Sequence, residues 1–204
     1  GAVVYFVPCN ASRDEGFINN IIADCQSCAD MRISATHLKY ISSIAEAGEA
    51  DIAVCITEED IALKQQWIQQ LCSTLAPETI IGVNTESFSL QDMQAKAKNP
   101  ERVIGLNWCE PAYTTYFLEV IANDITPSFI VENVEVAARN CWHKDPYIAH
   151  CGYSVKARLM AALAREAFYL VEHGYASVED IDRACRNDAG CYLPFAGNCR
   201  YMDL

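Results

Sequence analysis

The feature that most constrains the fold is an alternation of short apolar runs with segments of helical spacing over roughly the first 120 residues. The β-branched and aromatic runs Val3–Val7, Asp51–Ile56 and Thr79–Val83 predict strands. Asp51–Ile56 is apolar on both faces, as expected for a strand inside a parallel sheet. Because strands alternate with helices, the predicted fold class is α/β with a parallel sheet.

Amphipathic segments separate these strands. Apolar residues recur at helical spacing through Ile61–Leu75, and Pro77 ends that helix because its ring cannot continue it. The remaining expected elements are helices over Asp14–Ala29 and Leu90–Ala97 and strands over Arg102–Leu106 and Tyr116–Ile121.

The pattern changes near Asp145–Cys151, and from Gly152 onward no strand is predicted. Val155–Glu172 reads as one helix, with Gly174 placed to end it in a left-handed conformation. Ser177 opens the next helix, with Asp180 in the position of a capping-box acid. We therefore expect a sheet domain over residues 1–148 and an all-α segment over residues 149–204.

Composition restricts the classes of partner. The chain has 204 residues, of which 51% are hydrophobic, so it can bury one good core or two small ones. Its formal net charge is −12 and it has no basic cluster, which excludes binding to a nucleic-acid phosphate backbone. No apolar run approaches the length of a membrane-spanning helix.

Cysteine usage points to a reducing compartment. The 11 cysteines are odd in number, and several lie inside apolar runs, where cysteine acts as a small buried hydrophobe. Cys25 and Cys28 form the only C-x-x-C pair, and without a second pair of ligands we expect two helical cysteines rather than a zinc site, and no metal elsewhere. We expect an intracellular protein, cytoplasmic, or in the mitochondrial matrix if the source is eukaryotic.

Three stretches resemble one enzyme family in order and spacing. Asp51–Lys64 resembles a strand segment with its glutamate and following lysine, Val83–Val120 resembles the central catalytic block, and Arg165–Asp182 resembles the first helices of the C-terminal domain. Over roughly residues 35 to 204 the chain resembles the 3-hydroxyacyl-CoA dehydrogenase family.

This resemblance implies a function. The family oxidises 3-hydroxyacyl-CoA to 3-ketoacyl-CoA in fatty acid metabolism, with NAD as the hydride acceptor. A histidine oriented by a glutamate takes the hydroxyl proton, and a serine and an asparagine assist. The implied architecture is a Rossmann-like NAD-binding domain followed by a helical domain that usually forms a dimer.

The catalytic positions depart from the family pattern. Asn107 stands at the histidine position, and a carboxamide has no useful basicity near neutral pH. Glu86 stands at the serine position and Ala157 at the asparagine position. Glu110 follows the histidine site where the family has asparagine.

Other positions match the family. Glu119 corresponds to the glutamate that orients the histidine, although a lone glutamate beside a strand is more often a satisfied edge carboxylate. Glu59, Lys64 and Asn84 correspond to cofactor-side positions at strand ends. For Glu59 and Lys64 the alternative is an acid at a helix N-terminus and an exposed lysine.

The glycine loop of a dinucleotide-binding fold is missing from the sequence. That loop needs two glycines separated by one residue, and none of the nine glycines has this spacing. We expect the chain to begin at the family's second strand, formed by Val3–Val7, without the first strand and its glycine turn. A sheet edge left open in this way would need a partner or a second copy to cover it.

Two functional hypotheses follow. The first is a 3-hydroxyacyl-CoA dehydrogenase-like oxidoreductase that is inactive as this chain stands. The second is a non-catalytic scaffold or binding subunit derived from that family. Two loop histidines, His143 and His150, are alternative candidates for a base.

Overall fold

The structure is a computed structural model that describes residues 4–6, 38–112 and 114–202. The chain divides into two compact units, Gly1–Val155 and Lys156–Leu204. The expected helix over Asp14–Ala29, with Cys25 and Cys28, lies outside the described residues.

The first unit is built on a sheet of five strands in chain order, with a separate parallel pair formed by β1 (Val4–Phe6) and β2 (Leu38–Tyr40). The predicted strands over 51–56, 79–83, 102–106 and 116–121 are confirmed within one or two residues at their ends. The five strands are β3 (Ile52–Cys55), β4 (Ile80–Val83), β5 (Val103–Trp108), β6 (Phe117–Ile121) and β7 (Asp145–Ala149).

The sheet is mostly parallel, but β6 runs antiparallel to β5. The sequence pattern predicts only parallel strands. The reason for the difference is the short connection over residues 109–116, since a parallel crossover needs a dozen or more residues, usually including a helix. The next crossover, from β6 to β7, contains such a helix, α4 (Ser128–Asn140), and β7 is parallel to β6.

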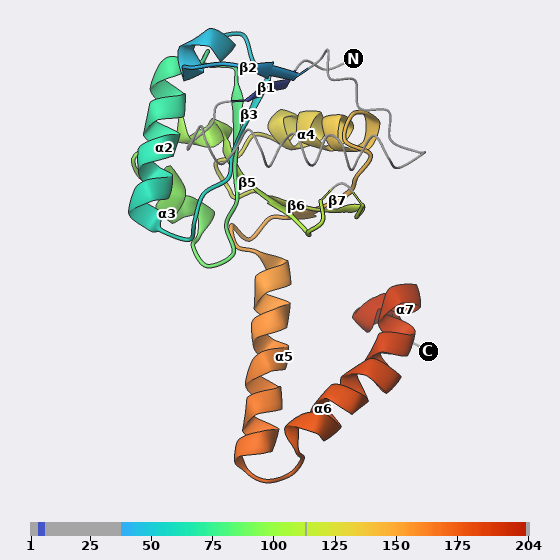
Figure 1. Ribbon diagram of the computed structural model, residues 1–204. Helices are drawn as coiled ribbons and strands as arrows, with labels where there is room; N and C mark the ends of the chain where they lie inside the picture. The colour runs from blue at the N-terminus through green and yellow to red at the C-terminus, as the bar shows by residue number, and fades with distance from the viewer. Residues whose placement is uncertain (1–3, 7–37, 113, 203–204) are drawn as a thin grey trace. The chain divides into compact units, whose positions relative to one another are not determined.

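Helices cover both faces of the sheet (Figure 1). The predicted helices are confirmed as α2 (Ile61–Thr74) and α3 (Leu90–Gln94), which pack on one face, while α4 packs on the other. Asp60 begins α2 by accepting a hydrogen bond from the Leu63 amide on its side chain, at 2.9 Å. The described part of the unit also contains the single turns η2 (Ile44–Ala47) and η3 (Pro100–Arg102).

Strand alternation divides the core into two apolar layers. Successive side chains of a strand point to opposite faces, so alternate residues enter different layers. The layer under α2 and α3 includes Ile81, Val83, Val103 and Ile121, and the layer under α4 includes Ile80, Ile104, Leu118 and Val120 from the same strands.

The second unit is helical, as predicted from Gly152 onward. Its helix α5 (Val155–Glu172) has the predicted bounds, and Gly174 follows it with a positive φ of 69°. Ser177 caps the next helix by accepting the Asp180 amide, at 3.1 Å. The elements after α5 are α6 (Val178–Ala184), η4 (Cys185–Ala189) and α7 (Gly190–Met202). Within the described residues no helix is both long and apolar enough to cross a membrane.

The contact between β5 and β6 leaves no room for a side chain at Gly105. A Cβ atom there would lie 2.8 Å from Ile121 Cβ, which is bonded directly to the backbone of β6 and cannot move aside without it. We expect Gly105→Ala to lower the free energy of unfolding by about 1–2 kcal/mol, measured by urea denaturation. Gly48→Ala, where the nearest atom would be 3.4 Å away, is the control. Equal unfolding midpoints for the two variants would contradict this packing.

Candidate functional site

A row of polar side chains continues the apolar layer under α2 and α3 at one end of the sheet. Asn107 follows Gly105 by two positions, and Glu119 and Tyr147 precede Ile121 and Ala149 by two. Asn107 pairs with Glu119 across β5 and β6, and Glu119 pairs with Tyr147 across β6 and β7. Strand register therefore brings three side chains that are far apart in the sequence into one line.

Glu119 is the centre of this row. Its side chain is fully buried, and its carboxylate accepts four hydrogen bonds. Oε2 accepts from Asn107 Nδ2 at 2.8 Å and from Ser154 Oγ at 2.7 Å. Oε1 accepts from the Tyr147 hydroxyl at 2.6 Å and from the Val155 backbone amide at 2.7 Å. A buried carboxylate is costly unless such donors surround it, and these bonds offset that cost.

Asn107 is held by three hydrogen bonds. Its Nδ2 donates to Glu119 and also to the Thr85 carbonyl, at 2.6 Å, while its Oδ1 accepts the Thr85 amide at 2.8 Å. The side chain is only 3% exposed. Both amide protons are therefore used, and the carboxamide joins the end of β4 to β5 and β6.

Lys64 forms a second buried polar centre, at the carboxyl ends of β3 and β4. Its side chain is fully buried, and Nζ contacts the carbonyl and side-chain oxygens of both Thr57 and Asn84, the shortest being 2.8 Å to the Asn84 carbonyl. Asn84 in turn bonds the Thr57 backbone through Nδ2 and Oδ1, at 2.9 and 2.8 Å. Lys64 thus holds two strand-end loops together, and the alternative of an exposed lysine is wrong.

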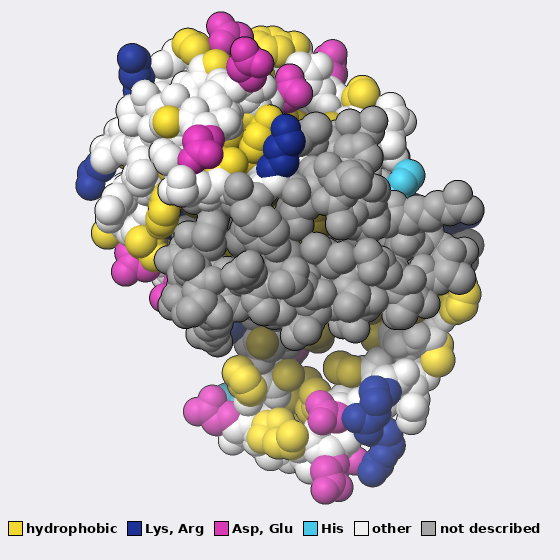
Figure 2. Space-filling view, turned by 45° about the horizontal axis from the view of Figure 1, so that its top comes forward, with side chains coloured by type: hydrophobic (Ala, Val, Ile, Leu, Met, Phe, Trp, Pro, Cys, Tyr) yellow, Lys and Arg dark blue, Asp and Glu magenta, His cyan; other side chains and the backbone are white. Residues whose placement is uncertain are grey.

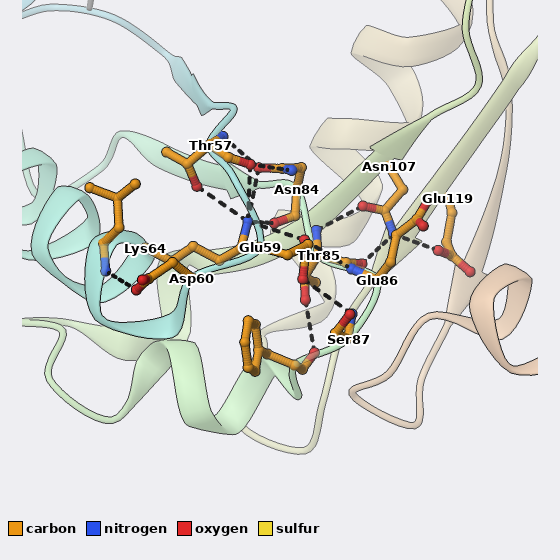
Figure 3. Close-up of polar contacts among 12 residues, drawn as sticks. Thr57, Glu59, Asp60, Lys64, Asn84, Thr85, Glu86, Ser87, Asn107 and Glu119 are labelled. Atoms are coloured by element: carbon orange, nitrogen blue, oxygen red, sulfur yellow. Dashed lines mark hydrogen bonds and ion pairs between the residues drawn. The ribbon is translucent and has the colours of Figure 1, made fainter.

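Glu59 links the same two loops at the surface. Its Oε1 lies 3.3 Å from Lys64 Nζ, and its carboxylate accepts the backbone amides of Glu86 and Ser87 at 3.4 and 3.3 Å. The Glu59 side chain is 34% exposed. Figure 3 shows the resulting continuity, from Lys64 and Glu59 through Asn84 and Thr85 to Asn107 and Glu119.

The other predicted positions are more dispersed. The Glu86 and Glu110 side chains are exposed, on the loops that follow β4 and β5. Ala157 lies in α5, within the second unit. His143 and His150 are both exposed on the loops that flank β7.

The loop over residues 109–116, which follows Asn107, is tied down by Lys144. The Lys144 ammonium donates to the carbonyls of Ala112 and Thr115, and the Thr115 hydroxyl donates to the Cys109 carbonyl at 2.9 Å. Burial lowers the pKa of the Lys144 ammonium from its ordinary value. This lysine fixes the route of the chain from β5 to β6.

Sequence reasoning missed three members of this network. Tyr147 lies on β7, a strand that the apolar pattern does not predict because Pro146 interrupts it. Ser154 directly precedes the predicted start of α5, so the N-cap preference for serine was an available signal. Thr57 carried no signal apart from its position after β3.

Metal ligation finds no support among the described residues. Nowhere in residues 4–6, 38–112 and 114–202 do three or more histidine, cysteine, aspartate or glutamate side chains gather closely enough to hold a metal ion.

Comparison with known proteins connects this geometry to a family. The family model for the NAD-binding domain of 3-hydroxyacyl-CoA dehydrogenase matches residues 17–149, and the model for the C-terminal domain of the same enzymes matches residues 152–204. The chain belongs to the 3-hydroxyacyl-CoA dehydrogenase family.

Individual members of the 3-hydroxyacyl-CoA dehydrogenase family give the same result. The 3-hydroxyadipyl-CoA dehydrogenase of Escherichia coli K12 is 31% identical over 152 residues, which are 74% of this chain and 32% of that enzyme. The crystal structure of 3-hydroxybutyryl-CoA dehydrogenase from Escherichia coli K12 matches with a TM-score of 0.77 and 27% identity, over 92% of this chain and 41% of the other. This chain therefore spans less than half the length of either relative.

A third structure supports the fold alone. The crystal structure of an NAD⁺-dependent dismutase that acts as a 5-dehydrogenase on a formyl-hydroxy-methylpyridine carboxylic acid matches with a TM-score of 0.80. It is 23% identical to this chain, over 98% of this chain and 67% of the other. The Rossmann-like fold class predicted from the sequence is thus confirmed.

The described loops carry a partly exposed carboxylate, which has the chemistry to accept a hydrogen bond from the ribose of NAD. Ligands of open α/β sheets bind beyond the carboxyl ends of the strands, where Glu59 is partly exposed. A carboxylate fits a ribose hydroxyl donor and not a pyrophosphate. Lys64 and Asn84 lie behind Glu59 with their polar atoms in contact with the loop backbone.

Lys64 provides a direct test of this arrangement. Replacement by methionine keeps the length of the side chain but removes the ammonium that donates to the Thr57 hydroxyl and to the Asn84 carbonyl. We expect Lys64→Met to lower the free energy of unfolding by about 2–3 kcal/mol. The exposed Lys96→Met is the control, and thermal denaturation measures both. If both variants have the same Tm as the parent chain, Lys64 does not stabilise the fold through these contacts.

Proposed function

We propose that this chain is a 3-hydroxyacyl-CoA dehydrogenase-like protein that does not catalyse the family's oxidation of 3-hydroxyacyl-CoA as it stands. The supporting observation is the bonding of Asn107. At the position of the family's histidine, a carboxamide donates both of its protons and accepts the Thr85 amide. It cannot take a proton from a substrate hydroxyl, because it has no basic nitrogen.

The neighbouring groups do not replace the lost base. General base catalysis needs an acceptor whose basicity suits neutral pH and which a substrate can reach. Glu119 is fully buried, and its carboxylate already accepts hydrogen bonds from Asn107, Tyr147, Ser154 and the Val155 amide, so it is not open to a substrate hydroxyl. Glu119 therefore keeps its family position while it orients an amide instead of an imidazole.

NAD is the cofactor in this proposal, because the family model over residues 17–149 is that of an NAD-binding domain. Within the described residues, Glu59 would accept a hydrogen bond from a ribose hydroxyl, and Lys64 and Asn84 would hold its loop in place. NAD supplies a hydride acceptor in the family reaction. The substrate class is acyl-CoA by the same relationship, which would place the protein in fatty acid metabolism.

The alternative function is a non-catalytic scaffold or binding subunit, and the surface of the second unit favours it. Helix α5 has no buried residue, and its apolar side chains Leu159 and Leu163 are 64% and 52% exposed. Figure 2 shows apolar side chains on the surface. A second copy of the chain would bury such residues, so we propose a homodimer.

We also propose an intracellular protein with domains over residues 1–148 and 149–204, and no nucleic-acid partner.

Titration with NADH tests cofactor binding and turnover together. We expect saturable quenching or enhancement of NADH fluorescence by the purified chain, and no consumption of NADH after addition of a 3-ketoacyl-CoA. Consumption would contradict the proposed inactivity and direct attention to Glu110, His143 and His150. A lack of binding at millimolar NADH would remove the cofactor from the proposal and leave the scaffold function.

Restoring a histidine tests the role of position 107. In Asn107→His the ring Nδ1–H would take the place of the amide that donates to Glu119, and Nε2 would be a base. We expect NADH-dependent reduction of a 3-ketoacyl-CoA to rise about 10²-fold or more above the background of the parent chain, since the protonated imidazole would donate a proton to the carbonyl oxygen in this direction and general acid catalysis contributes about that much.

Asn107→Gln is the matched control, because it retains an amide and adds no base. Equal rates for the two variants at saturating NADH would show that the absence of a histidine at position 107 is not what makes the chain inactive. Circular dichroism of both variants verifies that the fold is unchanged.

A further inference from the structure

Glu119 connects the sheet to the first residue of helix α5. Asn107 of β5 and Tyr147 of β7 reach its carboxylate from the two neighbouring strands. Ser154 and the Val155 amide reach it from the start of α5. Each oxygen therefore accepts one donor from the sheet and one from the chain at the start of the helix.

The hydrogen bond from the Val155 amide satisfies a donor that α5 itself cannot satisfy. The first four amides of a helix have no acceptor within it, and a negative charge near them is stabilising. Glu119 accepts the Val155 amide at 2.7 Å with an oxygen that is buried away from water. The carboxylate thus serves the first turn of α5 in the way that a capping side chain does, although it lies 36 residues away in the sequence.

We propose that Glu119 is a buried latch that fixes Val155, the first residue of α5, to strands β5 and β7, so that changes at position 107 or 147 are transmitted to the Val155 amide. Two donors compete for favourable positions on each oxygen. Removing one of the two sheet donors takes away one of the bonds that orient the carboxylate, which weakens its bonds to Ser154 and Val155. Glu119 is a positioning residue in this proposal, and no cofactor or substrate is needed for its action.

Hydrogen exchange of the Val155 backbone amide, followed by NMR, tests the latch. We expect about tenfold faster exchange in both Asn107→Ala and Tyr147→Phe, although the acceptor of the Val155 amide is Glu119 in the parent chain, because one charge-assisted bond to the carboxylate is removed in each. Glu119→Gln should have a larger effect, since it removes the charge and one acceptor oxygen.

A rescue variant separates the latch from a general loss of packing. Asn107→His restores a donor toward Glu119, so Val155 exchange should return close to that of the parent chain. Exposed Glu132→Gln on α4 is the control for a change of charge alone.

Exchange at two other backbone amides distinguishes a local effect at Val155 from general unfolding. Exchange at Ile68, in the core of α2, reports global unfolding, and exchange at Ile181, which donates to the Ser177 carbonyl in α6, reports the second unit. Faster exchange at Val155 with both of these unchanged supports the latch. Unchanged Val155 exchange in Asn107→Ala and Tyr147→Phe, or an equal rise at all three amides, overturns it. These readings need no NAD, so they stand apart from the proposed lack of catalysis.

Discussion

The buried carboxylate of Glu119 is the constraint on which the rest of the first unit depends. A charge without water must be surrounded by donors, and those donors come from β5, β7 and the chain at the start of α5. A slip of β6 by one residue would turn Glu119 toward the apolar layer under α4 and bring Leu118 or Val120 into the polar row. The carboxylate and the strand register therefore specify each other.

The same requirement explains why asparagine fits at position 107 without disturbing the fold. A histidine there would meet Glu119 with one ring nitrogen, whereas the amide meets Glu119 and both backbone groups of Thr85. The interior polar groups are satisfied, and the amide offers no basic nitrogen. Lys64 follows the same principle at the neighbouring strand ends, where an ammonium is surrounded by the oxygens of Thr57 and Asn84.

Much of the fold could be predicted from the sequence, because apolar runs such as Thr79–Val83 and caps such as Ser177 are local signals. The polar row was only partly predictable. Asn107 and Glu119 were identified through resemblance, but Tyr147 was missed because Pro146 obscures β7. The burial of Lys64 could not be foreseen, since it depends on Asn84 reaching across from the next strand. The antiparallel direction of β6 follows from the length of a connection and not from any residue type.

That short connection affects the order in which the fold can assemble. Residues 109–116 are all that separate β5 from β6, whereas β3 and β4 are joined through the whole of α2. Closing a short loop costs less chain entropy, and local pairings form earlier than distant ones. The hairpin of β5 and β6 already contains Asn107 opposite Glu119, so the centre of the polar row belongs to the most local part of the sheet. The carboxylate can then be enclosed in steps as β7 and α5 arrive.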